Sequence, residues 1–350
     1  MGSKNIKILV LITLCFGGIM GPISGKSQKV DTLVNALENM SEFFLNRHQD
    51  SSFIGNYSDE LALKLQGLGK INYFSIKDQK NNTNIKYVPV RDLRLGLGVA
   101  YKYFAFDINI GLGLESKSSI NNYRSFDVRA RIFSSKQYFN TFLQFYQGYR
   151  MSNIDHERYS KTDEFTIRDD IRTIHFGIQY FYVLNYTKFS LKAPFVFNEW
   201  QKKSAGSFLF GANFNIFILD ADSSMVPSIL KPEFANTLHL RDLSNLSVGV
   251  SVGYMYTYVF KENFFVTVSL LPGLILNNGD HSISNRVPTS RHFNGRIQSL
   301  NSIGYNSRRF FAGINIEGDG YWIRVADKQR VEVGQGSGSI FVGYRFRNKN

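Results

Sequence analysis

Residues 246–260 read Leu-Ser-Val-Gly-Val-Ser-Val-Gly-Tyr-Met-Tyr-Thr-Tyr-Val-Phe, with an apolar or aromatic side chain at every even position. A period of two residues indicates a β-strand with one apolar face. Strands in soluble proteins usually have roughly 5–6 residues, whereas a tilted strand that crosses a bilayer needs about 9–11. The alternation resumes at Phe264 after the polar residues 261–263. The stretch therefore predicts a hairpin of two membrane-length strands.

Aromatic side chains gather at one end of this hairpin, and transmembrane barrels carry such girdles where lipid meets water. We expect Tyr254, Tyr256 and Tyr258 to contact lipid headgroups there. A tryptophan followed by lysines is also typical of this interface, because long basic side chains reach phosphate groups. A second interface set is therefore assigned, with a functional site as the alternative: Trp200, Lys202 and Lys203.

The composition of the 350 residues favours a membrane barrel over a helical bundle. Apolar residues make up 43% and aromatic residues 15% of the chain. No stretch after residue 25 has the ~18 consecutive apolar residues of a membrane helix. We predict an all-β fold, a transmembrane up-and-down antiparallel β-barrel over residues 57–350. Fourteen strands are expected, with twelve as the alternative, and the choice depends on a weak alternation at residues 230–241.

The N-terminal residues have the pattern of a secretory signal peptide over 1–25, with Lys4 and Lys7 before an apolar run. Its cleavage would remove Cys15, the only cysteine. The predicted location is the bacterial outer membrane. Residues 26–56 precede the barrel, and apolar residues spaced by three and four predict one amphipathic helix over 31–47. We expect this segment to be either a periplasmic packing element or a plug.

The alternation also assigns a lipid-facing set to each remaining strand. Almost no turn separates the strand that ends at Tyr103 from the strand that begins at Phe104. This junction predicts the periplasmic end, where barrel turns are short. One predicted strand near residue 190 turns five apolar side chains toward lipid: Phe189, Leu191, Ala193, Phe195 and Phe197.

Charged side chains of the opposite parity should face the lumen, where a buried charge must pair or meet water. If most of them pair, the lumen holds a closed structural network. A surplus of cations would instead make a wet passage that favours anions. The predicted lumen-facing set is Arg94, Lys102, Asp107, Asp127, Arg129, Arg131, Arg172, His175 and Lys192.

One pair in this set makes a register prediction. The loop between Leu114 and Tyr123 is centred near residue 119. The residue numbers of two directly opposed residues in this hairpin should therefore add up to about 238. This sum places Asp107 directly opposite Arg131. We therefore predict a cross-strand ion pair that fixes the register.

The sequence indicates no catalytic or metal site. His175 has no serine or acid fixed beside it, so we expect a structural lumen histidine. No cluster of His, Cys, Asp or Glu has the spacing of metal ligands. We expect no enzymatic activity, no metal and no cofactor.

The charge balance suggests anionic neighbours. The formal net charge is +13, which falls to +11 when Lys4 and Lys7 leave with the signal peptide. The basic residues are scattered instead of forming the stripe of a nucleic-acid-binding protein. The expected partners are outer-membrane lipids, including anionic lipopolysaccharide headgroups, and the barrel-assembly machinery. We expect no nucleic acid and a monomer.

Three parts of the sequence carry a family resemblance: residues 95–102 (LGLGVAYK) with 104–107 (FAFD), 201–207 (QKKSAGS) and 248–254 (VGVSVGY). They resemble an uncharacterised family of Gram-negative outer-membrane barrels, domain of unknown function 4421. The resemblance covers roughly residues 60–346 and implies an outer-membrane location and a barrel fold. The family has no assigned activity, so no functional residues carry over.

Three functions are compatible with these observations. A passive pore or small-solute channel is the leading hypothesis. A structural or adhesive barrel with a filled lumen is the alternative, and an outer-membrane lipid hydrolase is the third.

Overall fold

The computed structural model describes residues 48–90, 93–111, 124–152, 167–227, 240–282, 286–288, 291–326 and 328–347. Residues Arg47–Asn350 form one compact unit. The predicted signal peptide and the predicted helix over 31–47 lie outside the described residues. Within the described ranges, no helix is long and apolar enough to cross a membrane.

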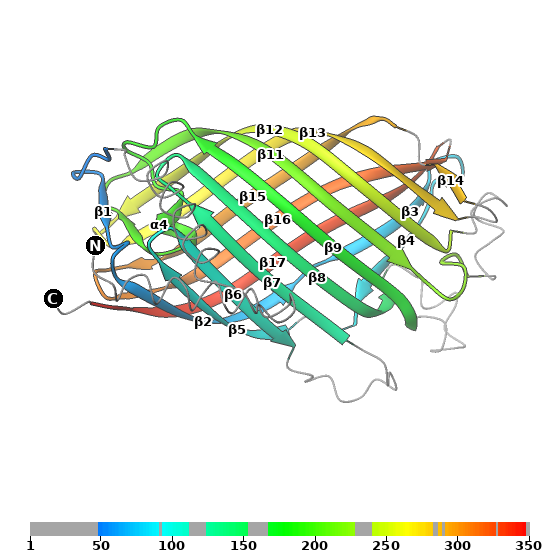
Figure 1. Ribbon diagram of the computed structural model, residues 1–350, viewed down its shortest axis with the longest axis horizontal. Helices are drawn as coiled ribbons and strands as arrows, with labels where there is room; N and C mark the ends of the chain where they lie inside the picture. Colours follow the sequence, from blue (N-terminus) through cyan, green and yellow to red (C-terminus); the bar gives the residue numbers. More distant parts are fainter. Residues whose placement is uncertain are drawn as a thin grey trace, which may run out of the picture. The chain divides into compact units, whose positions relative to one another are not determined.

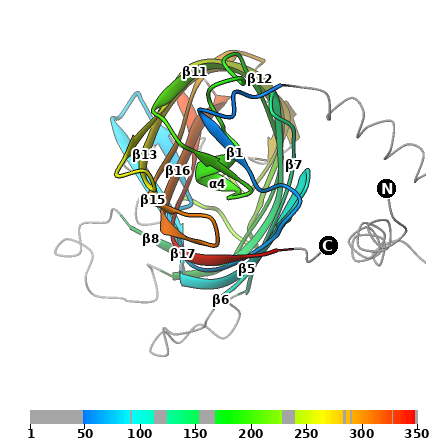
Figure 2. The same cartoon turned by 90° about the vertical axis from the view of Figure 1, so that its left-hand side faces the viewer.

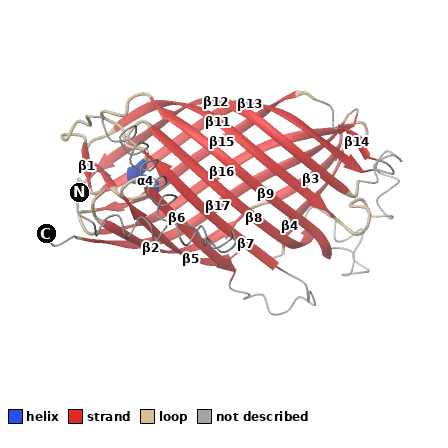
Figure 3. Ribbon diagram, in the orientation of Figure 1, coloured by secondary structure: helices blue, strands red, loops and turns tan. Residues whose placement is uncertain are grey.

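The fold is an all-β, transmembrane-type, up-and-down antiparallel barrel, as predicted (Figure 1; Figure 3). Fourteen strands of the described residues lie on the path around the sheet, which closes through β16–β17 and β7–β8 pairing. A short strand, β14 (Arg286–Pro288), pairs with β13 beside this path. The fourteen are β2 (Leu61–Lys70), β3 (Tyr73–Asp78), β4 (Thr83–Pro89), β5 (Leu93–Tyr101), β6 (Phe104–Gly111), β7 (Arg124–Phe133), β8 (Gln137–Met151), β9 (Ile167–Val183), β11 (Ala205–Asp220), β12 (Asp242–Phe260), β13 (Phe264–Ser282), β15 (Phe293–Asn306), β16 (Phe310–Ala326) and β17 (Gln329–Phe346).

The two ends of the barrel differ in their connections. The turns at 102–103, 134–136, 261–263 and 307–309 are short and lie at the end where Leu61 and Phe346 pair. We call this the termini end, and the opposite one the loop end. The termini end is the one predicted to be periplasmic.

The ring of described strands is wider at the termini end. There β17 pairs with β2, and the ring continues through β5, β6 and β7 to β8. At the loop end β17 pairs with β3, and β4 pairs directly with β8. The β6–β7 hairpin therefore leaves the ring partway along, and the described ring narrows from twelve strands to ten.

A glycine stands where β8 changes partners. Gln147 is the last β8 residue opposite β7, and Tyr149 is the first opposite β4. Gly148 between them has a φ of 88°, a conformation that residues with a Cβ rarely adopt. The pairing of β8 with β9 is also irregular here, so Gly148 allows a bulge at the branch point.

The outer face is apolar along the wall strands. On β12 the even-numbered Val250, Val252 and Tyr254 are exposed, whereas the odd-numbered Ser251 and Met255 are buried. This alternation agrees with the predicted lipid-facing parity of 246–260. The barrel therefore presents an apolar belt outward.

The predicted strand at 189–197 is wrong. Leu209 lies opposite Val183, so residues 184–204 begin and end at the termini end. They form the short helix α4 (Lys192–Phe195) and β10 (Glu199–Gln201), which pairs with β1 (Ile54–Asn56). Phe189, Leu191, Ala193, Phe195 and Phe197 are all buried instead of facing lipid. Apolar residues at every second position are as compatible with burial inside this end of the barrel as with contact to lipid. The pattern alone therefore could not distinguish a lipid-facing strand from a segment that fills the mouth.

The weak strand at 230–241 lies largely outside the described residues. Asp220 pairs directly with Asp242, so β11 ends and β12 begins at the loop end. This pairing excludes a single crossing there. The two additional members of the predicted fourteen are instead β3 and β4, which extend the runs of β2 and β5.

Candidate functional site: the barrel lumen

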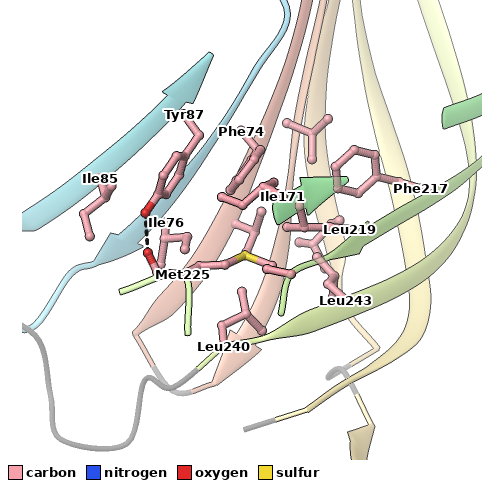
Figure 4. Packing of buried hydrophobic residues seen from close by; sticks show 14 of the residues in the cluster. Phe74, Ile76, Ile85, Tyr87, Ile171, Phe217, Leu219, Met225, Leu240 and Leu243 are labelled. Atoms are coloured by element: carbon pink, nitrogen blue, oxygen red, sulfur yellow. Dashed lines mark hydrogen bonds between the residues drawn. The ribbon is translucent and has the colours of Figure 1, made fainter. Parts of the chain in front are cut away.

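Inward-facing side chains arrange the lumen in three layers along its axis. An apolar loop-end layer includes Phe74, Tyr87 and Phe217, and Figure 4 shows these side chains converging with Met225 and Leu243. The Tyr87 hydroxyl donates a hydrogen bond to the Met225 carbonyl. Met225 and Val226 follow β11 and are buried, so the chain turns inward into the mouth.

This inward turn is tied to the wall of the barrel. The Arg168 guanidinium donates to the carbonyl oxygens of Ser224, at 2.9 Å, and Ser223, at 3.2 Å. Arg168 also makes a two-pronged ion pair with Asp170, at 2.6 and 2.7 Å. A wall arginine thus holds the backbone that turns inward at the loop-end layer.

A polar layer fills the middle of the barrel. The structure places Arg94, Asp107, Asp127 and Arg131 here as buried side chains, and Arg129 beside them. Five further charged residues complete the layer: Lys64, Lys70, Arg296, Glu317 and Asp319.

Every cation named in the polar layer has an acidic partner. Asp107 accepts from Lys64 at 2.9 Å and pairs with Arg131. Asp127 pairs with Lys70 at 2.9 Å and lies 3.6 Å from Arg94, whose guanidinium also stacks on Tyr146. The remaining pairs are Arg129 with Glu317 and Arg296 with Asp319. Most charges of the layer are therefore paired, as a structural network requires, although the six cations named here outnumber the four carboxylates by two.

Two small cavities lie among the described residues of the polar layer. A cavity of about 30 Å³ is lined by Lys70, Arg129 and Glu317 among others. A second cavity of about 20 Å³ lies between Asn72, Tyr146 and His175. On this measure about 10–15 Å³ is enough for one water molecule, so each space suits one or two waters. Two buried carbonyl oxygens in this region, on the side chains of Asn72 and Asn140, have no hydrogen-bond partner among the described residues and would suit such waters.

His175 lies in the lumen at the border with the loop-end layer. Its ring packs edge-on against Phe142 and Phe217, with centroids 5.2 and 5.5 Å apart, and contacts the Gln335 amide. Among the described residues, no serine hydroxyl or carboxylate hydrogen-bonds to this ring. This packing corresponds to a structural histidine.

An apolar termini-end layer lies at the other mouth. Its centre is the segment 184–204, which we call the plug (Figure 2). The Phe197 ring stacks 4.7 Å from Phe311 and lies 4.6 Å from Phe341, both from the wall. Phe197 has a φ of 63°, which is costly for a bulky residue and is maintained only by surrounding contacts.

Polar contacts fix the plug from within. The buried Glu199 carboxylate pairs with Lys192 and accepts from Ser190. Lys192 is therefore inside the barrel end, but it stands on α4 and not on a wall strand. The wall residue Asn306 donates to the carbonyl oxygens of Ala193, at 3.3 Å, and Glu199, at 3.0 Å.

A wall arginine also binds the plug. Arg345 of β17 donates to the Phe197 carbonyl at 2.6 Å and to the Ser307 carbonyl in the turn between β15 and β16. Its guanidinium lies 4.6 Å from the Tyr57 ring centre. Burial raises the pKa of the Tyr57 hydroxyl, which stands before the first wall strand.

Two residues of the predicted lumen set are placed elsewhere. Arg172 was predicted to face inward, but it shares the parity of Ile174 and lies on the outer face, paired with Asp220 and Asp222. Lys102 was also predicted inside, but it occupies the turn between β5 and β6 with a φ of 50°. The prediction for Arg172 assigned the wrong parity. The prediction for Lys102 extended the strand through what is a turn.

The predicted interface residues divide into two groups. Tyr254, Tyr256 and Tyr258 are exposed on the outer face of β12. Trp200 and Lys202 belong to the plug region, where Trp200 donates to the Glu262 carbonyl and Lys202 to the Ser51 carbonyl. Lys203 lies with its ammonium 5.2 Å from the Phe53 ring centre. Contact of these residues with headgroups stays a prediction.

Several lumen charges were missed although their signal was in the sequence. Lys64 and Lys70 have the parity opposite to Leu63 and Leu65, and Glu317 and Asp319 have the parity opposite to Ile316. Extending the period of two through these strands would have found them. Glu199 carried no such signal, because it has the same odd-numbered parity as Phe189 to Phe197, which the alternation assigned to lipid. Among the described residues, no group of three or more His, Cys, Asp and Glu side chains could hold a metal ion.

Comparisons with known proteins give one family match. The family model described as domain of unknown function (DUF4421) matches residues 48–346. No curated protein matches the sequence. The similar solved structures include the outer membrane protease OmpT from Escherichia coli, at 8% identity and a TM-score of 0.39, covering 83% of this chain and 98% of that one. The Pseudomonas putida toluene transporter TodX has 8% identity and a TM-score of 0.28, covering 86% and 99%. A Pseudomonas aeruginosa FadL homologue has 9% identity and a TM-score of 0.24, covering 85% and 94%. Values this low assign neither an activity nor a substrate to the chain.

Proposed function

Since this chain belongs to the family of domain of unknown function 4421, which carries no assigned activity, we propose a function from the geometry of its lumen. The protein is an integral outer-membrane barrel that serves as a filled, structural element and not as a passive pore. The observation that carries this proposal is that three packed layers follow one another along the lumen: the apolar loop-end layer, the polar layer and the apolar termini-end layer. The barrel is a monomer that is surrounded by outer-membrane lipids. The barrel-assembly machinery inserts it into the membrane.

The outer face supports the membrane location. Leu97, Ile110 and Val250 are each more than 60% exposed, although they are large and apolar. Soluble proteins rarely expose contiguous apolar surface on this scale. A bilayer would cover the whole belt, with the tyrosines of β12 near one of its edges.

The lumen supports the absence of a pore. The two cavities among the described residues of the polar layer, of about 30 and 20 Å³, suit waters and are far smaller than the channel that a sugar or amino acid would need. The closing side chains come from the wall as well as from the plug, so loss of the plug alone leaves the loop-end layer in place. The passive pore, which led among the sequence-based hypotheses, has no support in this arrangement.

An absence of enzymatic activity is part of the same proposal. His175 is buried among aromatic rings, where a substrate has no access. Ser190 hydrogen-bonds to Glu199, but both are buried within the plug. Nucleophilic catalysis needs a reachable nucleophile beside a base, and neither serine nor histidine here provides one.

Liposome swelling tests the proposal. Vesicles that contain the refolded full chain should swell no faster than empty vesicles in an isosmotic pentose solution. A variant in which residues 185–204 are replaced by a short glycine-serine turn should also stay closed, because the loop-end layer remains. Swelling of the wild-type vesicles at the rate of an open porin of similar strand number would contradict a filled barrel.

A further inference from the structure

Four neighbouring strands carry a basic outer face at the loop end: β16, β17, β3 and β4 (Figure 1). Arg324, Arg330 and Lys77 are successive cross-strand neighbours and form one row across the first three of these strands. Arg324 has the same parity as the exposed Ile316, so the row lies on the lipid-facing side. Neighbouring strands lie about 4.8 Å apart, and the row is therefore about 10 Å wide. We call it the cation row.

The cations of this row are held in place by the residues beside them. Glu332 pairs with Lys77 and with Arg330, both at 2.8 Å. The Arg330 guanidinium also lies 5.5 Å from the Trp322 ring centre. The Lys77 and Arg330 side chains keep about a third of their surface exposed. Cations fixed in this way lose less conformational freedom when they bind an anion.

The face around the cation row has a surplus of positive charge. The outward positions of the four strands carry four cations and one carboxylate, a net charge of +3: Arg324, Arg330, Lys77, Lys86 and Glu332. The adjoining strand ends and turns add two charges of each sign: Lys80, Lys328, Asp78 and Asp327. Arg150 on the flanking β8, opposite Val88, is a further cation. A phosphate monoester carries about −1.5 to −2 charges at pH 7, so the complement of this face is a headgroup with two phosphates.

Toward the middle of the barrel the same outer face lacks side chains. Its outward positions are glycines on β16, β17 and β2, and we call this surface the furrow: Gly320, Gly318, Gly336, Gly338, Gly69 and Gly67. A Cβ added at Gly320, Gly318 or Gly338 meets nothing within 4 Å. Ile316 and Ile340 beside the furrow are each more than half exposed. An acyl chain can therefore approach the backbone closely here, between apolar side chains.

We propose that this face binds a phosphorylated saccharolipid of the lipid A class, the membrane anchor of lipopolysaccharide. The proposal rests on the outer-membrane location proposed above, with the loop end in the outward leaflet. Phosphate oxygens accept hydrogen bonds from Arg324, Arg330 and Lys77, and one acyl chain lies along the furrow. Arginine suits this role because its paired N–H donors match phosphate oxygens. A lipid with a single phosphodiester would leave part of the cation row without an anion and bind less well.

Native mass spectrometry of the full barrel in detergent tests this proposal, with a chelator present so that no divalent cation bridges lipid and protein. The two probes are diphosphorylated lipid A and phosphatidylglycerol. Lipid A should be retained about tenfold more, the effect of two exposed ion pairs. The double variant Arg324→Gln with Arg330→Gln should lose this preference. A matched double variant at the termini end, Arg308→Gln with Arg309→Gln, removes two exposed arginines and should keep it.

A further double variant tests the furrow without changing the charge. Gly318→Val with Gly338→Val places side chains in open space, so the barrel should still fold. Retention of lipid A should fall severalfold, because the added side chains hold the acyl chain away from the backbone and its close contacts are lost.

Four outcomes would overturn the proposal: equal retention of the two lipids, a preference that survives the Arg324 and Arg330 changes, an equal loss in the termini-end variant, or unchanged retention in the furrow variant. Protease protection of the barrel in vesicles separates this inference from the proposed function. An unprotected wall would contradict the membrane location itself. A protected wall without a preference for lipid A would contradict only this site.

Discussion

Asp107 of β6 lies directly opposite Arg129 of β7, yet its carboxylate pairs with Arg131, two residues further along, and with Lys64 of β2. The predicted ion pair between Asp107 and Arg131 is therefore present, but the predicted register is wrong by two residues. Arg131 instead stands opposite Ala105, whose small side chain leaves room for the guanidinium to reach across. A shift of two residues preserves the faces of both strands, which is why the inward parity was still right.

Asp107 should be among the most sensitive positions of the lumen. Asp107→Asn would leave Lys64 and Arg131 buried without their anion, which typically costs about 3–5 kcal/mol. Urea unfolding of the refolded barrel measures the change. Asp59→Asn, at an exposed position of the termini end, should change the free energy of unfolding by less than about 0.5 kcal/mol. Similar values for the two variants would show that the polar layer is hydrated and not closed.

If a bilayer surrounds the apolar belt, the free-energy cost of an arginine on the outer face should depend on its depth in that bilayer. Val250→Arg places a charge in the middle of the lipid-facing side of β12 and should destabilise the inserted barrel by about 2–4 kcal/mol. Ser244→Arg lies on the same face of the same strand, near the loop end, and should cost about 0–1 kcal/mol. Unfolding from lipid vesicles compares the two. Equal costs would be incompatible with a bilayer around this belt.

The branch point predicts a backbone effect. Gly148→Ala adds a Cβ at a φ of 88° and should destabilise the barrel by about 1–3 kcal/mol. Gly318 is the matched control, because a Cβ added there meets nothing within 4 Å. Gly318→Ala should be neutral or stabilising by about 0.4–1 kcal/mol. If Gly148→Ala is as well tolerated as Gly318→Ala in thermal unfolding, the bulge at the partner switch is not required.

The plug should depend on its wall arginine. Arg345→Met removes donors to the Phe197 and Ser307 carbonyls, and the backbone amides of residues 190–201 should exchange with solvent about tenfold faster or more. Arg347→Met, two residues along at an exposed position, is the control and should leave exchange unchanged. Hydrogen exchange followed by mass spectrometry resolves this segment. Unchanged protection in the Arg345 variant would mean that aromatic packing alone holds the plug.

Periodicity of two predicted the barrel, its apolar outer face and most of the lumen charges, because one buried face forces alternation along every wall strand. It failed where an alternating apolar pattern could face either the lipid or the inside of the barrel mouth. Phe189 to Phe197 alternate like a lipid-facing strand, but they fill the mouth, and only the contact with Phe311 and Phe341 distinguishes the two. The inward prediction for Arg172 was wrong for a different reason. Arg172 has the same even-numbered parity as the lipid-facing Ile174, so the alternation already placed it on the outer face. The narrowing of the described ring depends on pairing between segments distant in sequence, β4 with β8, which no local pattern reports.

Current across a planar bilayer tests the filled lumen most directly. The refolded full chain, inserted as a protease-protected barrel, should give no steady conductance above that of the lipid alone, because apolar layers close both mouths of the lumen. Its insertion must be shown in the same preparation, so that silence reflects a closed barrel and not an absent one. Steady, ohmic single-channel steps from the wild-type protein would contradict the account.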